Sequence, residues 1–528
     1  MSAQGGESAP PTTLHGTLRP APAEPGRAAQ AAAGATGGDP SLGWRGLVAA
    51  PGEPHSGAAP DPGGRVLLAL AHLSDLHLCD AESPARQEYL DHHGDPGAPY
   101  AARLGVIGTY RPQEILTVQV AACALTAVGR VGRGPVTGAP LDALLATGDV
   151  TDNAQSNELR WYTELMTGRV VSPWSGDPAR SSWVGASGTG DWRAYFWHPD
   201  GPADGEPADL PTARYGYPRI PGLVEAARRP VRSPGAGLPL LTVHGNHDSL
   251  LQGTVAPTPA LHALATGTER IVGLSAGQTP LVILEGAAPL GPARYTHDDT
   301  APRIAVAPDP ERGLVERPER GWWARDVGEV RVLALDTVNP HGGWQGSVGS
   351  EQLAWLETEL ERAQDRYVVV TSHHPSWTLT NGYAPSGAEP RHLADEVLGL
   401  LLRFPSVIAW VAGHVHAHSH LWHAAPGREG GLWEITTSSL IDWPQQLRVL
   451  EVVREAGGTV AIASTVVDHS AGPAWGPEAM SDPAGLAAVS RALAANDYRV
   501  RGALGHRGST EGTPADRNAV WRLPDPLR

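Results

Sequence analysis

Hydrophobic residues along the chain gather in short, nearly continuous runs, and each run ends abruptly in polar residues. Runs of this length without alternation are typical of strands that are buried on both faces of a sheet. The runs are Val66–Leu73, Leu141–Ala146, Pro239–Val243, Val330–Leu335, Tyr367–Val370 and Val407–Ala412. Because a polar cluster follows each run, the pattern predicts an α/β sheet with the functional residues at one edge.

Segments with helical periodicity lie between these runs. Helices are predicted over Glu114–Val131, Ser156–Met166, Glu351–Ala363, Pro390–Phe404 and, later, Asp482–Ala495, with Pro483 in its first turn. After Gly413 the pattern returns to strands, at Leu432–Ile435 and Leu447–Val453. These late strands favour a mixed sheet or a two-sheet sandwich over a purely parallel sheet.

Composition divides the chain into one large domain and two flanking segments. Residues 1–64 are rich in Ala, Gly and Pro, which predicts an irregular segment whose first ~40 residues are disordered. The main domain is predicted over 65–470, and a mostly polar C-terminal extension over 471–528. Within the domain, residues 168–235 carry Trp174, Trp183, Trp192 and Trp197 without a usable period. This insertion is either a cap over a substrate or a surface loop pinned by its own Trp side chains.

Charge and composition exclude several classes of function. The chain contains no lysine, so mechanisms that need a Walker lysine or a Schiff-base lysine are excluded. The formal net charge of −16 disfavours stable binding to nucleic acids or to anionic membranes. With only Cys79 and Cys123, neither a disulfide framework nor a thiolate zinc site is available. Any metal must therefore be bound by His, Asp, Glu or Asn.

The N-terminal residues from Met1 to Pro60 show neither an apolar signal-peptide core nor a twin-arginine pair, and no apolar stretch reaches ~18 residues. We therefore expect a cytoplasmic protein without a membrane anchor.

Five polar motifs close the apolar runs, in the order D-x-H, G-D-x-x-D, G-N-H-D, H-x-P and G-H-x-H. Side chains at positions i and i+2 of a strand point to the same face, so Asp75 with His77, and His414 with His416, are each placed to bind one ion. Asp149, Asn246 and His373 stand at the ends of three other runs. Each motif alone is weak, but their joint order is specific.

On these motifs, Leu67 to about His416, with related sheet to about Asp468, resembles the calcineurin-like metallophosphoesterases, including the class III cyclic nucleotide phosphodiesterases. The stretches Thr436–Gln446 and Gly512–Asn518 are similar to a high-GC bacterial subgroup, some of whose members are said to be exported. The resemblance implies a four-layer α/β/β/α sandwich with mixed sheets and two metal ions at the strand ends.

Motif by motif, the resemblance implies one metal ion held by Asp75, His77 and His416, a second held by Asn246, His373 and His414, and Asp149 as the bridge. A carboxylate can span two ions ~3.5–4 Å apart, whereas the amide of Asn offers one neutral oxygen. Oxygen and imidazole ligands suit divalent Mn, Fe, Zn or Co, and the sequence does not choose among them.

The resemblance also implies a catalytic role for His247, which matches the family's non-ligand histidine that protonates or steadies the leaving oxygen, and Asp248 is the candidate to orient it. In His373-His374-Pro375 the family pattern favours His373 as the ligand. The remaining histidines, among them His418 and His420, are expected to have structural roles, although strand alternation would place these two on the same side as His416.

The sequence thus predicts a dinuclear metal-dependent phosphoesterase in which metal-bound hydroxide attacks a phosphodiester or a small nucleotide-like phosphate. The alternatives are a phosphomonoesterase and a non-catalytic scaffold on the same fold. No tyrosine follows the bridging Asp149, which disfavours an iron–tyrosinate centre, and Asn153 stands where the protein phosphatases have arginine. The physiological substrate and the oligomeric state stay open.

Overall fold

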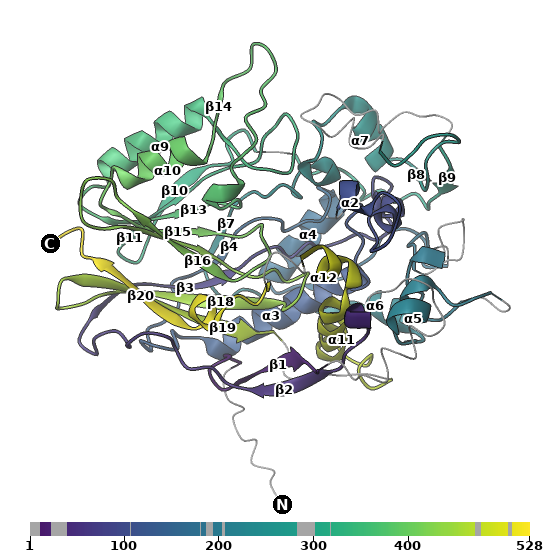
Figure 1. Cartoon of the computed structure of the whole chain (residues 1–528), viewed down its shortest axis with the longest axis horizontal. Helices are drawn as coiled ribbons and strands as arrows, with labels where there is room; N and C mark the ends of the chain where they lie inside the picture. The colour runs from purple at the N-terminus through teal and green to yellow at the C-terminus, as the bar shows by residue number, and fades with distance from the viewer. Residues whose placement is uncertain are drawn as a thin grey trace, which may run out of the picture.

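The computed structural model describes residues 11–22, 40–105, 107–179, 181–185, 194–202, 206–281, 301–316, 318–469, 472, 477–504 and 509–528. Two six-stranded sheets lie one above the other in Figure 1. The first has the order β20-β19-β18-β3-β4-β7, and the second has the order β10-β11-β13-β15-β17-β16.

Both sheets combine parallel and antiparallel strands. In the first, β3 (Arg65–Leu73), β4 (Ala143–Ala146) and β7 (Leu240–Thr242) are parallel, while β18 (Gln446–Arg454), β19 (Thr459–Asp468) and β20 (Ala519–Pro524) complete it antiparallel. In the second, β11 (Val330–Ala334), β13 (Tyr367–Thr371), β15 (Val407–Ala412) and β17 (Gly431–Thr436) are parallel, with β10 (Trp323–Val327) and β16 (Ser419–Ala424) as antiparallel edges. The predicted α/β class with mixed sheets is confirmed.

Alternate residues of the central strands serve two different cores, which explains their continuous apolar runs. In β13, Val369 packs between the two sheets, whereas Val368 and Val370 pack outward against helices. In β3, Leu68 and Leu70 likewise face the other sheet. A strand covered on both faces needs apolar residues at every position, and each fully buried Val or Leu contributes about 1.5–3 kcal/mol.

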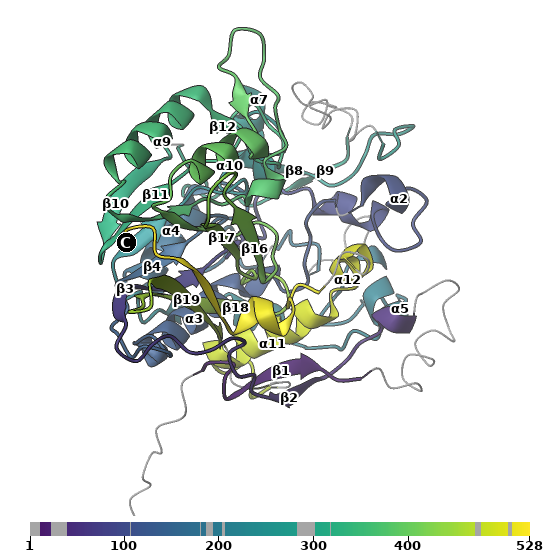
Figure 2. The ribbon, with the colours of Figure 1, turned by 60° about the vertical axis from the view of Figure 1, so that its left-hand side comes forward.

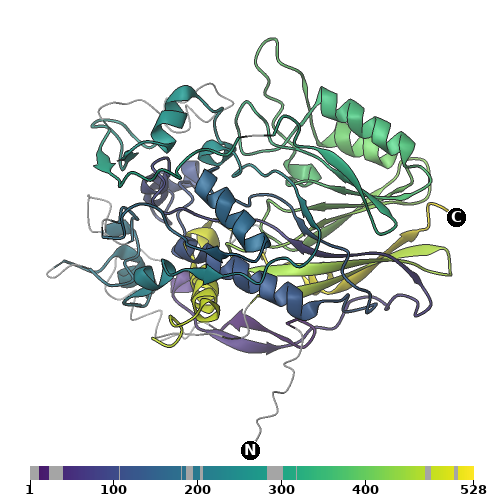
Figure 3. The ribbon, with the colours of Figure 1, turned by 180° about the vertical axis from the view of Figure 1, so that it is seen from behind.

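Helices cover the outer face of each sheet. The helices α3 (Thr117–Val131) and α4 (Ser156–Met166) pack on the first sheet and are seen in front of it in Figure 3. The helices α9 (Ser350–Arg362) and α10 (Ala394–Leu402) pack on the second sheet. Residues 114–131 reach the length and mean hydropathy (1.4) of a membrane span, but 78% of that window is buried inside the protein. We therefore interpret this segment as a core helix.

The N-terminal segment is more ordered than its composition predicts. The strands β1 (Gly16–Pro20) and β2 (Leu47–Pro51) form an antiparallel pair. Leu18 and Leu47 pack on α11 (Pro483–Asn496), so a few apolar side chains suffice once a helix from the other end of the chain covers them. Figure 2 shows this pair below α11. The prediction of an irregular segment is wrong for these residues, while residues 1–10 and 23–39 lie outside the described part.

The C-terminal extension also adds a strand that we did not predict. After α12 (Tyr498–Leu504) and α13 (Pro514–Arg517), β20 pairs with β19. Ala519, Trp521 and Leu523 point into the core between the sheets. Their alternation was a readable signal of a strand within a segment otherwise dominated by polar residues.

The insertion at 168–235 packs around its own aromatic side chains. Trp183 and Trp197 are fully buried together with Tyr215 and Leu493, and Trp192 lies outside the described residues. Its two ends meet in a short strand pair, β5 (Val170–Val171) with β6 (Val231–Arg232), and it carries α5 (Leu210–Tyr215) and α6 (Leu223–Ala227). In Figure 1, α5 and α6 lie on the right, opposite the C-terminus. A covering role over the substrate remains a prediction.

Shorter elements complete the described chain: α2 (Ala101–Leu104), α7 (Pro259–Ala265), β8 (Glu269–Ile271), β9 (Arg303–Ala305), β12 (Val348–Gly349), β14 (Arg391–His392), and the 3-10 helices η1 (Pro40–Leu42), η2 (Glu88–His93), η3 (Glu114–Leu116), η5 (Leu250–Gly253) and η6 (Ser376–Thr378).

Candidate metal centre

All seven predicted ligands follow the C-terminal ends of parallel strands from both sheets. They come after β3 (Asp75 and His77), β4 (Asp149), β7 (Asn246), β13 (His373) and β15 (His414 and His416). The structure brings their side chains together, and all but the half-buried His414 and His416 are buried. The predicted site at the C-terminal ends of the strands is therefore a single cluster of oxygen and nitrogen donors.

The predicted ligands lie in turns after the strands, so strand alternation does not explain how their side chains are oriented. The strands β3 and β15 end at Leu73 and Ala412, before the ligands begin. Five of the predicted ligands lie in turns and have left-handed backbones: φ is 53° at Asp75, 45° at His77, 49° at Asp149, 67° at His414 and 53° at His416. Backbone hydrogen bonds clamp the turns, for example from the amide of His77 to the carbonyl of Asp149 (2.9 Å).

The same difference corrects the placement of His418 and His420. Since β16 begins only at Ser419, the alternation does not run back to His416. The ring of His418 accepts a hydrogen bond from Arg448 (2.8 Å), and His420 pairs with Asp516 (2.7 Å). Both are structural contacts away from the donor cluster.

The first group of donors, which we name the Asp75 half-site, consists of Asp75, His77 and His416. The Nε2 atoms of His77 and His416 are 3.3 Å apart. The Oδ1 atom of Asp75 lies 3.2 Å from Nε2 of His416 and 3.9 Å from Nε2 of His77. Donor atoms bound to one ion at about 2.0–2.2 Å are separated by similar distances, so these three fit around a single cation.

The second group, the Asn246 half-site, consists of Asn246, His373 and His414. The Oδ1 atom of Asn246 lies 3.1 Å from Nε2 of His373 and 3.1 Å from Nδ1 of His414. The two histidine nitrogens are 3.2 Å apart. This group is as compact as the first.

Asp149 joins the two half-sites. Its Oδ2 atom lies 3.2 Å from Nε2 of His373 and 3.7 Å from Nε2 of His77. Its Oδ1 atom accepts a hydrogen bond from the backbone amide of His247 (2.7 Å), which fixes the carboxylate. One carboxylate thus faces both groups of donors, as a bridging ligand would.

The charge balance of the cluster also fits cations. Oδ1 of Asp75 is buried and receives no hydrogen bond among the described residues. Burial alone would lower the pKa values of His416 and His373. The charges of Asp75 and Asp442 nevertheless raise the pKa of His416 to about 10, and the charge of Asp149 is the chief reason that the pKa of His373 is raised to about 9. Each half-site therefore draws one positive charge, which a metal ion would supply.

Three of the histidines predicted as ligands are oriented by a contact at the ring nitrogen that does not face the other donors. Nδ1 of His77 faces Oδ1 of Asp152 (3.3 Å), and Nδ1 of His416 faces Oδ2 of Asp442 (2.7 Å). Nδ1 of His373 donates to the carbonyl of Thr147 (2.7 Å). Such contacts leave the Nε2 lone pair for a metal. Sequence reasoning missed Asp152 and Asp442 as supporting residues, although Asp152 closes the G-D-x-x-D motif.

The ambiguity in His373-His374 is resolved by hydrogen bonding. Nδ1 of His374 bonds to the hydroxyl of Thr337 (2.8 Å), and its Nε2 donates to the carbonyl of Trp344 (3.0 Å). Its ring lies close enough to His373 and His414 to be counted with them as a possible ion site, but both of its nitrogens are already used. His373 is the residue whose Nε2 faces the other donors.

Comparison with known proteins agrees with this geometry. Residues 220–418 match the model of the family described as calcineurin-like phosphoesterase. The predicted resemblance is confirmed. The match contains Asn246, His373, His414 and His416, while Asp75, His77 and Asp149 precede it in the sequence and join it only in the fold.

The chain is also similar to curated phosphodiesterases over part of their length. It is 33% identical over 95 residues to a probable cyclic nucleotide phosphodiesterase of Synechococcus sp. (strain WH7803), covering 18% of this chain and 35% of that protein. It is 30% identical over 144 residues to a glycerophosphodiester phosphodiesterase of Enterobacter lignolyticus, covering 27% and 47%. The matches thus span between about a third and a half of these relatives.

Among solved structures, a dimetal phosphatase from Danio rerio aligns over 77% of this chain and all of its own, at 12% identity and a TM-score of 0.33.

Within the donor cluster, His247 lies beside the predicted ligands but is oriented by a different residue from the one predicted. Its Nδ1 atom bonds to the backbone carbonyl of Asp152 (2.9 Å), and its ring packs edge-on against His77 with centroids 4.2 Å apart. Asp248 instead accepts hydrogen bonds from Thr151 (2.9 and 3.0 Å) and from the amide of Gly245 (2.9 Å). The carboxylate of Asp248 braces the turn, and Asp152 orients His247.

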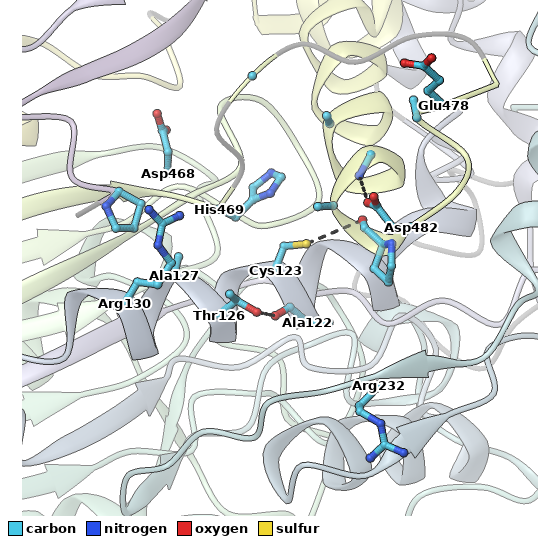
Figure 4. Close-up of a pocket in the computed structure, with 17 residues that line it drawn as sticks. Ala122, Cys123, Thr126, Ala127, Arg130, Arg232, Asp468, His469, Glu478 and Asp482 are labelled. Atoms are coloured by element: carbon cyan, nitrogen blue, oxygen red, sulfur yellow. Dashed lines mark hydrogen bonds between the residues drawn. The ribbon is translucent and has the colours of Figure 1, made fainter. Parts of the chain in front are cut away.

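A cavity of about 700 Å³ lies between α3 and α11, lined in part by Cys123, His469 and Asp482 (Figure 4). None of the seven predicted ligands lines it. The thiol of Cys123 donates to the carbonyl of Pro483 (3.7 Å), and burial raises its pKa to about 12, so it is a packed thiol. The donor side chains of the five motifs therefore lie at the strand ends and not in this cavity.

Proposed function

We propose that this chain is a dinuclear metal-dependent phosphoric ester hydrolase acting on a phosphodiester or a small nucleotide-like phosphate. The observation that carries the proposal is the sharing of Asp149 between two compact groups of donors. The relatives are named as phosphodiesterases, which supports a diester substrate.

The residues divide into metal holders and a proton donor. When bound, two cations would supply Lewis-acid charge to the phosphoryl oxygens and to a water nucleophile. Asp75, His77 and His416 would hold one, Asn246, His373 and His414 the other, with Asp149 between them. These assignments require neutral imidazole at His77, and burial, followed by the charge of His247, lowers the pKa of His77 to about 4.

His247 is placed to serve the leaving group. Its Nδ1–H bond to the carbonyl of Asp152 fixes the tautomer and leaves Nε2 as the atom that meets substrate. A proton held at Nε2 would pass to the ester oxygen as the P–O bond breaks, so that the alcohol leaves neutral.

The test combines metal analysis with a comparison of substrates. Purified protein supplemented with Mn²⁺ should bind about two equivalents and hydrolyse bis-p-nitrophenyl phosphate, and EDTA should remove both properties until metal is restored. Asp326→Asn, in an exposed ion pair on β10, is the control that should change neither. One equivalent or none would refute the dinuclear centre.

The same assay separates the alternatives. Faster hydrolysis of p-nitrophenyl phosphate than of the diester would assign a phosphomonoesterase. Two bound metals without hydrolysis of either ester would indicate a non-catalytic scaffold.

A further inference from the structure

One large aromatic side chain at the edge of the candidate metal centre, that of Trp344, is exposed to solvent. Trp344 is 51% exposed, whereas Trp161, Trp183, Trp197 and Trp410 are completely buried. Its indole ring stacks on the imidazole of His414, with centroids 5.9 Å apart and an interplanar angle of 28°. One face of the indole therefore covers a ligand of the Asn246 half-site, and much of the remaining ring surface is in contact with solvent.

The backbone that carries Trp344 is held firmly. The carbonyl of Trp344 accepts the hydrogen bond from Nε2 of His374 (3.0 Å). The amide of Gly343 donates to the carbonyl of Thr254 (3.0 Å), and Nδ2 of Asn381 donates to the carbonyl of Gly342 (2.7 Å). Gly343 has a φ of 94°, and a Cβ atom there would lie 2.4 Å from Nδ2 of Asn381. The loop thus fixes the position of an exposed aromatic ring.

The local chemistry suits a planar polar ring better than a flexible apolar chain. The loop that carries Trp344 also contains the polar residues Asn339, His341 and Gln345, and the side chain of Asn381 lies against Gly343. An acyl chain would need a continuous aliphatic groove. A flat heteroaromatic ring gains most from stacking on an indole and can keep its polar edge in water.

We propose that Trp344 is a substrate-binding residue that stacks on the nucleobase of a nucleotide-type phosphoester. The proposal rests on the function proposed above and narrows its substrate class. A phosphate at the donor cluster would lie beside His414, and a base joined to it through a sugar would extend over the outer face of Trp344. Stacking recognises any base, so it selects nucleotides as a class and not one base.

Two esters with the same leaving group test this selection. Thymidine 5′-(p-nitrophenyl phosphate) and methyl p-nitrophenyl phosphate both release p-nitrophenolate, and only the first keeps a base on the phosphorus. Trp344→Ala should lower kcat/KM for the thymidine ester by about 5- to 100-fold, mainly through KM, and leave the methyl ester within about twofold of wild type. Trp344→Phe should keep most of the activity on the thymidine ester.

The matched control is Trp422→Ala, because Trp422 is 38% exposed on the edge strand β16, outside the donor cluster. It should leave both esters unchanged. Equal losses on both esters in Trp344→Ala, with or without lost metal, would make Trp344 a support for His414 and overturn the proposal. No change on either ester would also overturn it.

A binding measurement keeps the inference testable if hydrolysis fails. Should metal-loaded wild type hydrolyse neither ester, the proposed function falls, while calorimetric titration with AMP still reports on stacking. AMP should bind about 5- to 100-fold more weakly to Trp344→Ala than to wild type, and glycerol 3-phosphate should bind equally to both. Equal affinities of the two proteins for AMP would refute a base-stacking role.

Discussion

The two half-sites are built from similar donors but are supported by different groups. In the Asp75 half-site, the histidine rings contact two carboxylates, those of Asp152 and Asp442. These carboxylates form ion pairs with Arg86 (2.5 Å) and Arg111 (2.6 Å), respectively. Behind the Asn246 half-site the contacts are neutral: His373 donates to the carbonyl of Thr147, and Nδ2 of Asn246 donates to the carbonyl of Gln252 (3.1 Å).

This difference bears on how tightly each ion would be held. A carboxylate behind an imidazole makes the ring a better electron donor than a carbonyl does, and a charged partner locks its orientation. We therefore expect the Asp75 half-site to bind its ion more tightly. The Asn246 half-site should exchange its ion more readily, and it is also the half-site that Trp344 covers.

Asp149 offers the most severe test, because it belongs to both half-sites. Asp149→Ala should abolish binding of both ions and lower kcat/KM for bis-p-nitrophenyl phosphate by about 10³-fold or more. Metal content measured beside activity checks this. Retention of one tightly bound ion would show that Asp149 serves only one half-site and would contradict its role as a bridge.

His247 separates proton transfer from metal binding. His247→Gln should keep both ions and lower kcat by about 10²- to 10⁴-fold, the range typical of a general acid. The loss should be smaller for p-nitrophenyl esters than for alkyl esters, because p-nitrophenolate leaves without a proton. Equal losses would indicate a positioning role, and loss of an ion would place His247 among the ligands of the Asp75 half-site.

Asp442 tests the asymmetry itself. Asp442→Asn should weaken the tighter of the two ions by about 10- to 100-fold, as expected for a residue that orients a ligand, and should leave the weaker ion nearly unchanged. Competition with a metal-sensitive dye can follow the two affinities separately. Because Arg111 loses its charged partner, thermal unfolding must show that the variant is folded. Weakening of both ions alike would contradict the asymmetry.

The smallest expected effect concerns His72. This residue bonds to Thr147, whose carbonyl accepts the hydrogen bond from His373 in the Asn246 half-site. The Nε2 atom of His72 bonds to the hydroxyl of Thr147 (2.9 Å), and burial, followed by the charge of Arg448, lowers the pKa of His72 to about 3. Between pH 6.5 and pH 3 the His72 side chain therefore binds a proton in the unfolded chain but not in the folded protein. This one group lowers the free energy of unfolding by about 1.4 kcal/mol per pH unit as pH decreases towards 3.

Urea denaturation at pH 7.5 and at pH 5 measures that contribution. His72→Gln should remove about 2 kcal/mol of the loss seen in wild type between these pH values. His262→Gln, on the exposed face of α7, is the control. An unchanged dependence on pH would show that His72 is not held neutral in the folded protein.

The sequence predicts the strands, and the donor side chains that the fold brings together, because both follow from local order. An apolar run followed by D-x-H or G-H-x-H is visible in a few consecutive residues, and the family match begins only at residue 220. The supports depend instead on contacts between distant segments: Asp442 is 26 residues from His416, and Arg111 is 331 residues from Asp442. No periodicity reports such pairs.

The prediction for Asp248 failed for a related reason. Its position next to His247 in the sequence suggested contact, but adjacent residues in a tight turn point in different directions, and Asp248 turns back to Thr151 and Gly245. The ordered β1–β2 pair was missed because its partner, α11, lies more than 400 residues away in the sequence. The composition of a segment indicates only how much apolar surface it can bury within itself, and not what it buries against a distant helix.

The left-handed backbones of five predicted ligands limit the substitutions that this site could accept in evolution. Aspartate, asparagine, histidine and glycine adopt that conformation at a lower cost than bulky or β-branched residues do. Glutamate at Asp75 would therefore meet a conformational penalty as well as a longer reach. Asparagine and glycine, each one nucleotide away from aspartate, keep the backbone and discard the charge. Drift at these positions would thus lead to folded proteins that bind metal poorly, and an inactive homologue should be recognised by Asn or Gly at ligand positions within an otherwise intact framework.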